Sequence, residues 1–136
     1  MSVVPKLYTY KVKVLKIIDG DSVRLDTDCG FGITLTNQSC RVALIDTPES
    51  RVNIKRYPER AAEKELGLKA KKRLTELLQG EVILHCLERD KYGRLLGELY
   101  VEGKSVGDTL VEEGLACVYD GGTKNAKVRE DGTWGE

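Results

Sequence analysis

The sequence predicts a mainly β fold with helices (α+β), in which five strands form a barrel, a long helix lies between the third and fourth strands, and a short helix follows the fifth. Two patterns carry this prediction. Several short runs alternate or stay apolar, as strands do, and one longer segment repeats apolar residues at helical spacing. The chain has 136 residues, of which 40% are hydrophobic. This suffices for one core, so we expect a single domain over residues 1–136, with its core at about residues 7–120.

The first three strands should form an antiparallel meander. They are rich in β-branched and aromatic residues and comprise residues 7–18, 22–27, 33–36 and 39–45. Asp19-Gly20 provides the first turn. Asn37-Gln38 would form a bulge or a loop within the third strand.

A long amphipathic helix is expected after a polar loop at residues 50–57. Pro58 suits its first turn and Gly80 suits its C-terminal cap. Its apolar stripe, which would pack on the barrel, consists of Ala62, Leu66, Ala70, Leu74, Leu77 and Leu78. Gly67 lies inside the helix, where glycine costs about 1 kcal/mol relative to alanine.

The second half of the chain predicts two more strands and a short helix. The strands are residues 81–87 and 94–101, and the helix spans residues 105–113. Residues 121–136 are polar, so we expect a poorly ordered tail there, with little order beyond about residue 125. Five strands with a helix between the third and fourth match a five-stranded Greek-key OB-fold barrel, whose concave face commonly binds oligonucleotides.

Charge and hydropathy limit the functional classes. The chain has 22 basic and 22 acidic residues and a formal net charge of zero. This counts against a strong nucleic-acid binder, although a local basic patch would still suffice for one. No apolar run is long enough to span a membrane. The first residues lack the features of a signal peptide, which favours a cytoplasmic protein, although a secreted protein without its leader would look the same.

The cysteines do not predict a zinc site or a redox motif, because no two have the C-x-x-C spacing. Cys29 and Cys40 flank a hairpin and could form a disulfide, but we expect free thiols. His85 and Cys86 are neighbours on a predicted strand, so they should point to opposite faces and are interpreted as structural.

Three charged stretches lie at the ends of strands: Asp19–Ser22, Arg41–Glu49 and Asp90–Arg94. The middle one is the most unusual, because an arginine precedes an apolar strand and two carboxylates follow it. Lone buried charges are costly, so such an arrangement needs a reason. Carboxylates of the first two stretches could hold a hard cation, and arginines of the last two could hold a phosphate.

These stretches resemble the three signature blocks of the thermonuclease family, the family of staphylococcal (micrococcal) nuclease. The matching blocks are residues 19–25, 41–49 and 90–94, and their order and approximate spacing agree over residues 10–120. The resemblance implies an OB-fold and a calcium-dependent phosphodiesterase. We therefore expect an endonuclease, a monomer without a membrane partner, that cleaves single-stranded DNA and RNA and leaves 3′-phosphate ends.

The expected metal ligands are the carboxylates of Asp21 and Asp46, and the resemblance adds the backbone carbonyl of Thr47. Oxygen ligands suit calcium or magnesium and do not suit zinc. The resemblance implies Ca²⁺. Asp19 would lie near the metal, and Ser22 stands where the family usually has threonine.

The expected catalytic residues are Arg41, Glu49 and Arg94. The planar guanidinium groups match two phosphoryl oxygens, and both should face an open cleft. Glu49 could accept the proton of the attacking water. On an ideal strand Arg41 and Asp46 point to opposite faces, so both reach one site only if the strand bends near Ile45, as the resemblance implies.

Lys91, Tyr92 and Tyr119 resemble residues that contact the terminal phosphate and the bases, although Tyr119 would equally suit the core. Two alternatives remain. A non-catalytic OB-fold module of the same family would bind nucleic acid or a protein. A calcium-binding structural domain would leave Arg41 and Arg94 unexplained. The presence of these arginines together with Glu49 favours the enzyme.

Overall fold

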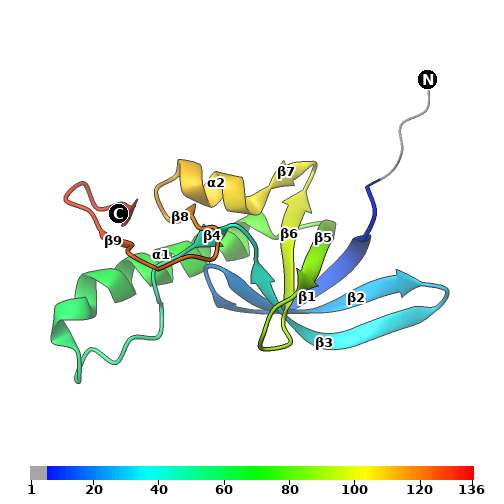
Figure 1. The fold of residues 1–136 in the computed structure, drawn as a ribbon, viewed down its shortest axis with the longest axis horizontal. Coiled ribbons are helices and arrows are strands. Elements are labelled where there is room, and N and C mark those ends of the chain that lie inside the picture. The colour runs from blue at the N-terminus through cyan, green and yellow to red at the C-terminus, as the bar shows by residue number, and fades with distance from the viewer. Residues whose placement is uncertain (1–5) are drawn as a thin grey trace.

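The computed structural model describes residues 6–136 and shows a β-barrel flanked by helices (Figure 1). The strands are β1 (Thr9–Asp19), β2 (Ser22–Gly30), β3 (Ile33–Val42), β4 (Ile45–Asp46), β5 (Val82–Arg89), β6 (Leu95–Val101), β7 (Lys104–Ser105), β8 (Cys117–Val118), β9 (Lys127–Val128) and β10 (Trp134–Gly135). The helices are the 3₁₀-helix η1 (Pro58–Arg60), α1 (Ala61–Leu77) and α2 (Val106–Glu112). The expectation about a signal peptide concerns residues 1–5, which lie outside the described residues.

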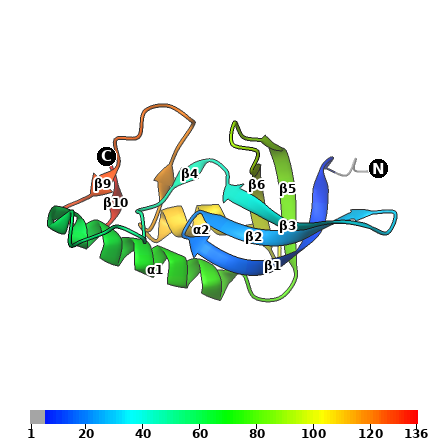
Figure 2. The same cartoon turned by 90° about the horizontal axis from the view of Figure 1, so that it is seen from below.

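Five strands close the barrel. The antiparallel order β3-β2-β1-β5-β6 is completed by a parallel pairing between β3 and β6, in which Arg41 lies opposite Leu96. Helix α1 lies between the third and fourth barrel strands, β3 and β5, and α2 follows the fifth, β6. The predicted OB-fold barrel of the α+β class is therefore confirmed. Figure 2 shows the β2–β3 hairpin extending beyond the barrel on the side away from α1.

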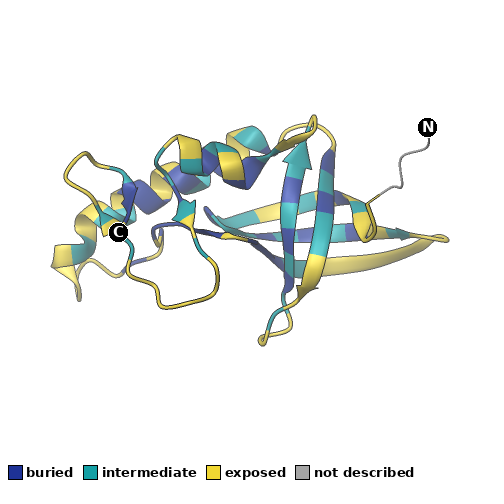
Figure 3. Cartoon of the chain, turned by 45° about the horizontal axis from the view of Figure 1, so that its top comes forward, coloured by how far each residue is buried: buried dark blue, intermediate teal, exposed yellow. Residues whose placement is uncertain are grey.

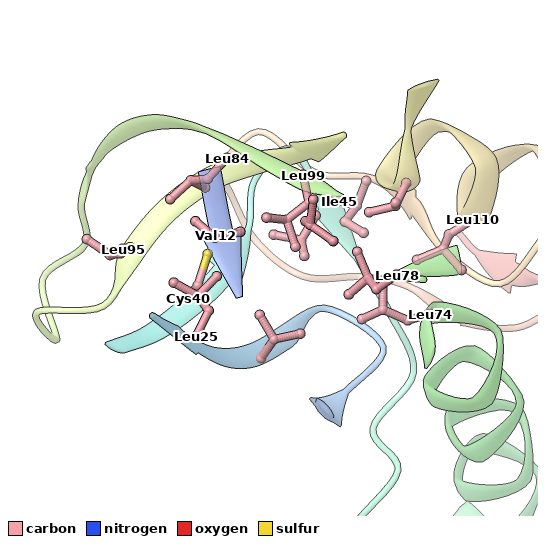
Figure 4. Packing of buried hydrophobic residues seen from close by; sticks show 14 of the residues in the cluster. Val12, Leu25, Cys40, Ile45, Leu74, Leu78, Leu84, Leu95, Leu99 and Leu110 are labelled. Carbon is pink, nitrogen blue, oxygen red and sulfur yellow. The ribbon is translucent and has the colours of Figure 1, made fainter. Parts of the chain in front are cut away.

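The core fills the barrel and continues under the helices (Figures 3 and 4). Leu25, Leu84 and Leu99 are fully buried inside the barrel, and Leu74 and Leu110 extend the core to α1 and α2. Because both helices pack against the strands that carry the charged stretches, the core fixes those stretches relative to one another.

The apolar stripe of α1 agrees with the prediction except at its start. Leu66, Ala70 and Leu74 are buried, whereas Ala62 is exposed. Gly67 is buried in addition, and a Cβ at this position would lie 2.5 Å from the carbonyl oxygen of Glu49. The glycine therefore lets the loop that carries Glu49 approach the helix closely.

The third strand does not run to Ile45 as predicted. Strand β3 ends at Val42, Leu44 adopts a φ of 69°, and β4 pairs with β8 instead. Leu44 was expected in a buried strand but is 55% exposed. A positive φ is costly for leucine, so tertiary pairing on both sides of Ala43–Leu44 must stabilise this bend.

The expectation of a poorly ordered C-terminus beyond residue 125 is wrong. Strands β9 and β10 form a hairpin, and Trp134 is only 6% exposed. The backbone N–H of Trp134 donates to the carbonyl of Gly114 at 2.8 Å. One buried indole anchors a segment whose other residues are mostly polar, and average composition does not reveal such an anchor.

Three smaller points complete the fold. Asn37 adopts a φ of 51° within β3, next to a register shift of the β2–β3 ladder, so it forms the bulge that was one of the two expectations there. The cysteines are free thiols, and Cys40 is buried. Within residues 6–136, no helix is long and apolar enough to cross a membrane.

Candidate active site

A cleft of about 490 Å³ opens where the end of β1, the β3–β4 bend, the start of α1 and the C-terminus meet. All the residues predicted as catalytic or metal-binding line it, namely Asp21, Arg41, Asp46, Thr47, Glu49 and Arg94. The lining also includes Asp19, Arg51, Arg60, Glu63, Lys124 and Trp134. The fold thus brings together three stretches that are far apart in the sequence.

Arg41 lies at the bottom of this cleft and is buried, with 8% of its surface exposed. Its Nη1 donates to the carbonyl of Val42 at 2.8 Å, and its Nη2 donates to the carbonyl of Ile45 at 3.0 Å. The same guanidinium lies 3.3 Å from Asp21 Oδ2 and 3.9 Å from Asp46 Oδ1. Arg41 therefore spans the bend and contacts both carboxylates. Because of the bend, Arg41 and Asp46 reach one site, although an ideal strand would place them on opposite faces.

The two carboxylates have further partners. Ser22 Oγ donates to Asp21 Oδ1 at 3.1 Å. Trp134 Nε1 donates to Asp46 Oδ2 at 3.3 Å, and Lys124 Nζ lies 3.4 Å from Asp46 Oδ1. The indole and the ammonium both come from the segment that the sequence predicted to be poorly ordered.

The donor chemistry of this site fits a hard cation. Asp21 and Asp46 supply carboxylate oxygens, and Thr47 beside them is buried, with a side-chain hydroxyl that has no hydrogen-bond partner. Among residues 6–136, no three Asp, Glu, His or Cys side chains converge as a metal site. A cation here would therefore need backbone oxygens or water besides the two carboxylates, which calcium and magnesium commonly accept.

Glu49 stands at the edge of the cleft, with its side chain 52% exposed. Its carboxylate pairs with Arg60 at 3.0 Å, and its backbone N–H donates to Glu63 Oε2 at 3.3 Å. Arg60 also pairs with Glu63 at 2.8 Å. Hydrogen bonds raise the pKa of Arg60 above its usual value, and the bond with Glu63 contributes more than the bond with Glu49. The start of α1 thus holds both the backbone and the side chain of Glu49.

Asp19 anchors the loop that follows Glu49. Its carboxylate accepts hydrogen bonds from the hydroxyl of Ser50 and, at 3.0 Å, from Arg51 Nη2. Asp19 lines the cleft, as expected for a group near a metal, but its carboxylate is occupied by these two partners. Together with the close contact at Gly67, these bonds fix the path of the chain on both sides of Glu49.

Arg94 reaches the cleft from the turn after β5. Its Nε donates to Asp90 Oδ2 at 2.7 Å, and its backbone N–H donates to Asp90 Oδ1 at 3.0 Å. Partial desolvation opposes ionisation of Asp90, but hydrogen bonds from Arg94 and from the N–H of Tyr92 keep the pKa of Asp90 below its usual value. The side chain of Arg94 is 34% exposed, so it meets the expectation of facing an open cleft. Arg41 is buried, so it does not meet the expectation of facing an open cleft.

The residues predicted to contact nucleic acid lie outside this cleft. Tyr92 is 73% exposed on the β5–β6 turn, and the Nζ of Lys91 lies 5.3 Å from the centre of its ring. The hydroxyl of Tyr119 donates to the carbonyl of Gly122 at 2.7 Å. Tyr119 lines an adjoining cavity that shares Asp46 with the cleft, and it is not a core residue.

Sequence reasoning missed Arg60, Glu63, Lys124 and Trp134 as parts of the site. The charged residues among them resemble the other charges of a solvated surface, so no local signal distinguishes them. Trp134 did offer a signal, because it is the only tryptophan of the chain and stands in a polar segment. A lone large aromatic residue in such a segment is a candidate anchor.

Comparison with known proteins identifies relatives. A sequence model of the family described as "Staphylococcal nuclease homologue" matches residues 39–132. The SPbeta prophage-derived endonuclease YokF and the endonuclease YncB, both of Bacillus subtilis (strain 168), are each 38% identical over 117 residues, or 80% of this chain. An uncharacterized endonuclease of Escherichia coli O157:H7 is 29% identical over 111 residues, or 79% of this chain and 60% of the relative.

The chain spans 35% of the length of YokF and 49% of that of YncB. The family match covers more than half of the chain and includes the β3–β4 bend, Glu49 and Arg94. The chain belongs to the staphylococcal nuclease homologue family.

Proposed function

We propose that this chain is a calcium-dependent endonuclease, a hydrolase that cleaves phosphodiester bonds of single-stranded DNA and RNA and leaves 3′-phosphate ends. The observation that carries the proposal is the cleft in which Arg41 joins Asp21 and Asp46, with Glu49 and Arg94 at its edge. Family membership and the endonuclease names of the relatives support it. We further propose that the protein acts as a monomer.

The arginines neutralise the phosphodiester group. Arg94 reaches the cleft on a partly exposed side chain, and Arg41 presents its guanidinium from the floor. Arg94 pairs with Asp90 through Nε, so its Nη groups can donate two directed hydrogen bonds to phosphoryl oxygens. The Nη groups of Arg41 already contact two carbonyls and two carboxylates, so Arg41 acts on the phosphate mainly through its charge. Negative charge on these oxygens increases as water attacks, so preformed donors stabilise the transition state more than the bound substrate.

Glu49 accepts the proton of the attacking water. As the water oxygen bonds to phosphorus, its proton passes to the Glu49 carboxylate and the bond from phosphorus to the 5′ oxygen breaks. The 5′ oxygen takes up a proton from solvent, leaving a 3′-phosphate and a 5′-hydroxyl. Arg60 and Gly67 hold Glu49 for this step, one by its ion pair at 3.0 Å and the other by close packing against the backbone.

Asp21, Asp46 and the backbone carbonyl of Thr47 would hold the calcium ion. Bound there, calcium would supply positive charge beside the scissile phosphate. The side chains of Asp21 and Asp46 are only 13% and 9% exposed, and Arg41 contacts both carboxylates. A calcium ion would therefore meet carboxylates that are already fixed in place, which lowers the free-energy cost of organising the site.

The flanking nucleotides have room outside the cleft. We propose that Lys91 and Tyr92 on the β5–β6 turn contact a phosphate and a base on one side, and that Tyr119 contacts the strand on the other. Tyr92 and Tyr119 present ring faces on which bases can stack. The zero net charge predicts weak, salt-sensitive binding of nucleic acid.

Digestion of single-stranded DNA and RNA with calcium, with magnesium and with excess chelator tests this function. We expect cleavage with calcium and less with magnesium, because the stricter octahedral geometry of magnesium suits mixed carboxylate and backbone ligands less well. Full activity in excess chelator would exclude the metal. Binding of either nucleic acid without cleavage under any condition would favour the non-catalytic module instead.

A further inference from the structure

The carboxylate of Asp46 is contacted on both oxygens by one distant part of the chain. We call residues 119–135 the C-terminal segment. Its indole donor, Trp134 Nε1, lies 3.3 Å from Oδ2, and its ammonium, Lys124 Nζ, lies 3.4 Å from Oδ1. The other charged group near this carboxylate is Arg41, whose Nη2 lies 3.9 Å from Oδ1.

Trp134 is a fixed donor. The residue is 6% exposed, and β10, which begins with it, pairs with β9. Its backbone N–H donates to the carbonyl of Gly114, and its neighbour Thr133 packs tightly against Gly114. A donor held in this way orients the carboxylate that it binds and leaves Oδ1 to face a cation. Partners of this kind around metal ligands commonly contribute 10–100-fold to metal affinity.

Lys124, by contrast, is a solvent-exposed competitor. Its side chain is 56% exposed on the connection between β8 and β9, and its Nζ lies 5.3 Å from the centre of the Tyr119 ring. The ammonium stands at Asp46 Oδ1, the oxygen that Trp134 leaves available. A divalent cation that binds this oxygen would have to share it with the ammonium or replace it, since like charges repel at such short range.

We propose that the C-terminal segment sets the calcium affinity of Asp46 through two opposite contributions. Trp134 is a positioning residue that orients the carboxylate, and Lys124 is an internal counter-cation that calcium replaces. The proposal rests on the proposed function, because it takes Asp46 to be a calcium ligand. It gives the hairpin β9–β10 and the connection before it a role in the site besides packing.

Calcium binding to the full chain without nucleic acid tests this proposal by calorimetry. Trp134→Phe keeps the aromatic packing and removes the donor, so its calcium affinity should fall about 10–100-fold. Lys124→Gln removes the competing charge, so its affinity should rise about two- to fivefold, as expected for a largely exposed ion pair. Lys127→Gln, an exposed lysine of the same segment, should match wild type.

The fluorescence of the chain supplies a second readout, because Trp134 is its only tryptophan. Calcium at Asp46 should change the emission of the hydrogen-bonded indole in a saturable way, with the midpoint found by calorimetry. Asp46→Asn should abolish this change. Emission that does not respond while calorimetry detects binding would place the calcium away from Asp46 and overturn the proposal.

The outcomes separate the two levels of inference. Wild type that binds no calcium by calorimetry would contradict the calcium site of the proposed function itself. Wild type that binds calcium, with Trp134→Phe and Lys124→Gln both unchanged, would overturn the proposal about the C-terminal segment alone. Circular dichroism shows whether Trp134→Phe is folded. If it is not, Lys124→Gln decides, because an increase in affinity relative to Lys127→Gln supports the proposal and no increase overturns it.

Discussion

The floor and the rim of the cleft are held in different ways. The floor consists of Asp21, Arg41 and Asp46, whose side chains are 9–13% exposed, and Arg41 contacts both carboxylates. The rim consists of Glu49 and Arg94, whose side chains are 52% and 34% exposed. Each rim residue pairs instead with a charge outside the floor, Glu49 with Arg60 and Arg94 with Asp90.

Under the proposed function, this difference separates residues that would serve both folding and chemistry from residues that would serve chemistry alone. Arg41 satisfies two carbonyl groups of the bend and contacts the carboxylates of Asp21 and Asp46, so the fold depends on it. Exposed ion pairs contribute little to stability, so losing a rim pair should barely change the free energy of unfolding. Floor variants should therefore lose stability and activity together, and rim variants should lose activity alone.

Glu49→Gln should have the largest effect on turnover. The change keeps the size of the side chain and removes the proton acceptor, which is typically worth about 10²–10⁴-fold. Thermal stability should stay near that of wild type, because the ion pair with Arg60 is exposed. Cleavage rates and thermal melts of the same preparation measure both effects. Turnover within a few-fold of wild type would show that Glu49 is not the base.

Arg41→Lys should lower both turnover and stability. Losing a preorganised donor at a developing oxyanion costs roughly 10²–10³-fold in turnover. A lysine cannot serve the carbonyls of Val42 and Ile45 and both carboxylates at once, and each buried acceptor left without a partner costs about 1–3 kcal/mol. The melting temperature should fall by several degrees. An unchanged melting temperature would contradict the distinction between floor and rim.

Arg94→Lys is the matched rim variant, since it also keeps the charge and removes the planar group. We expect a similar loss of roughly 10²-fold or more in turnover, with a smaller change in substrate affinity. Its melting temperature should stay close to that of wild type, because the pair with Asp90 is partly exposed. If Arg94→Lys cleaves normally, this arginine is not part of the site. If it melts as early as Arg41→Lys, Arg94 belongs to the structural group.

Gly67→Ala tests whether the close contact between α1 and the backbone of Glu49 positions this rim residue. The new Cβ would lie 2.5 Å from the carbonyl oxygen of Glu49, so the loop must move. A misplacement of about 1 Å can cost roughly 10²-fold in rate. The control is Ala62→Ser, which changes an exposed position of the same helix and should leave turnover unchanged. Gly80→Ser would not serve as a control, because the positive φ of Gly80 would strain the new side chain. Normal turnover of Gly67→Ala would show that Glu49 does not depend on this contact.

The parts of the site that follow from local pattern were predictable from the sequence. Strand ends are marked by turn residues, so the sequence places Asp21, Asp46 and Arg94 at strand ends. Their chemistry, carboxylates with planar guanidinium groups, indicated a cation and a phosphate. The closed barrel also followed from the order of the strands and the helix.

The parts that depend on distant contacts were not predictable. The bend at Leu44 interrupts an apolar run that favours a continuous strand, and its stability comes from the pairing of β4 with β8. Gly67 looks unfavourable for a helix until Glu49 is seen against it. Trp134 contacts Asp46 across 88 positions of the sequence, which no periodicity signals.

The most direct measurement of the central claim is the calcium dependence of single-stranded DNA cleavage, in buffered free calcium, for wild type and Asp21→Asn. If Asp21 and Asp46 hold the calcium that cleavage requires, activity should vanish in chelator. Removing one carboxylate charge should then raise the calcium midpoint by about tenfold or more, since ligand charge sets calcium affinity. An unchanged midpoint in Asp21→Asn, or cleavage by wild type without calcium, would contradict the account.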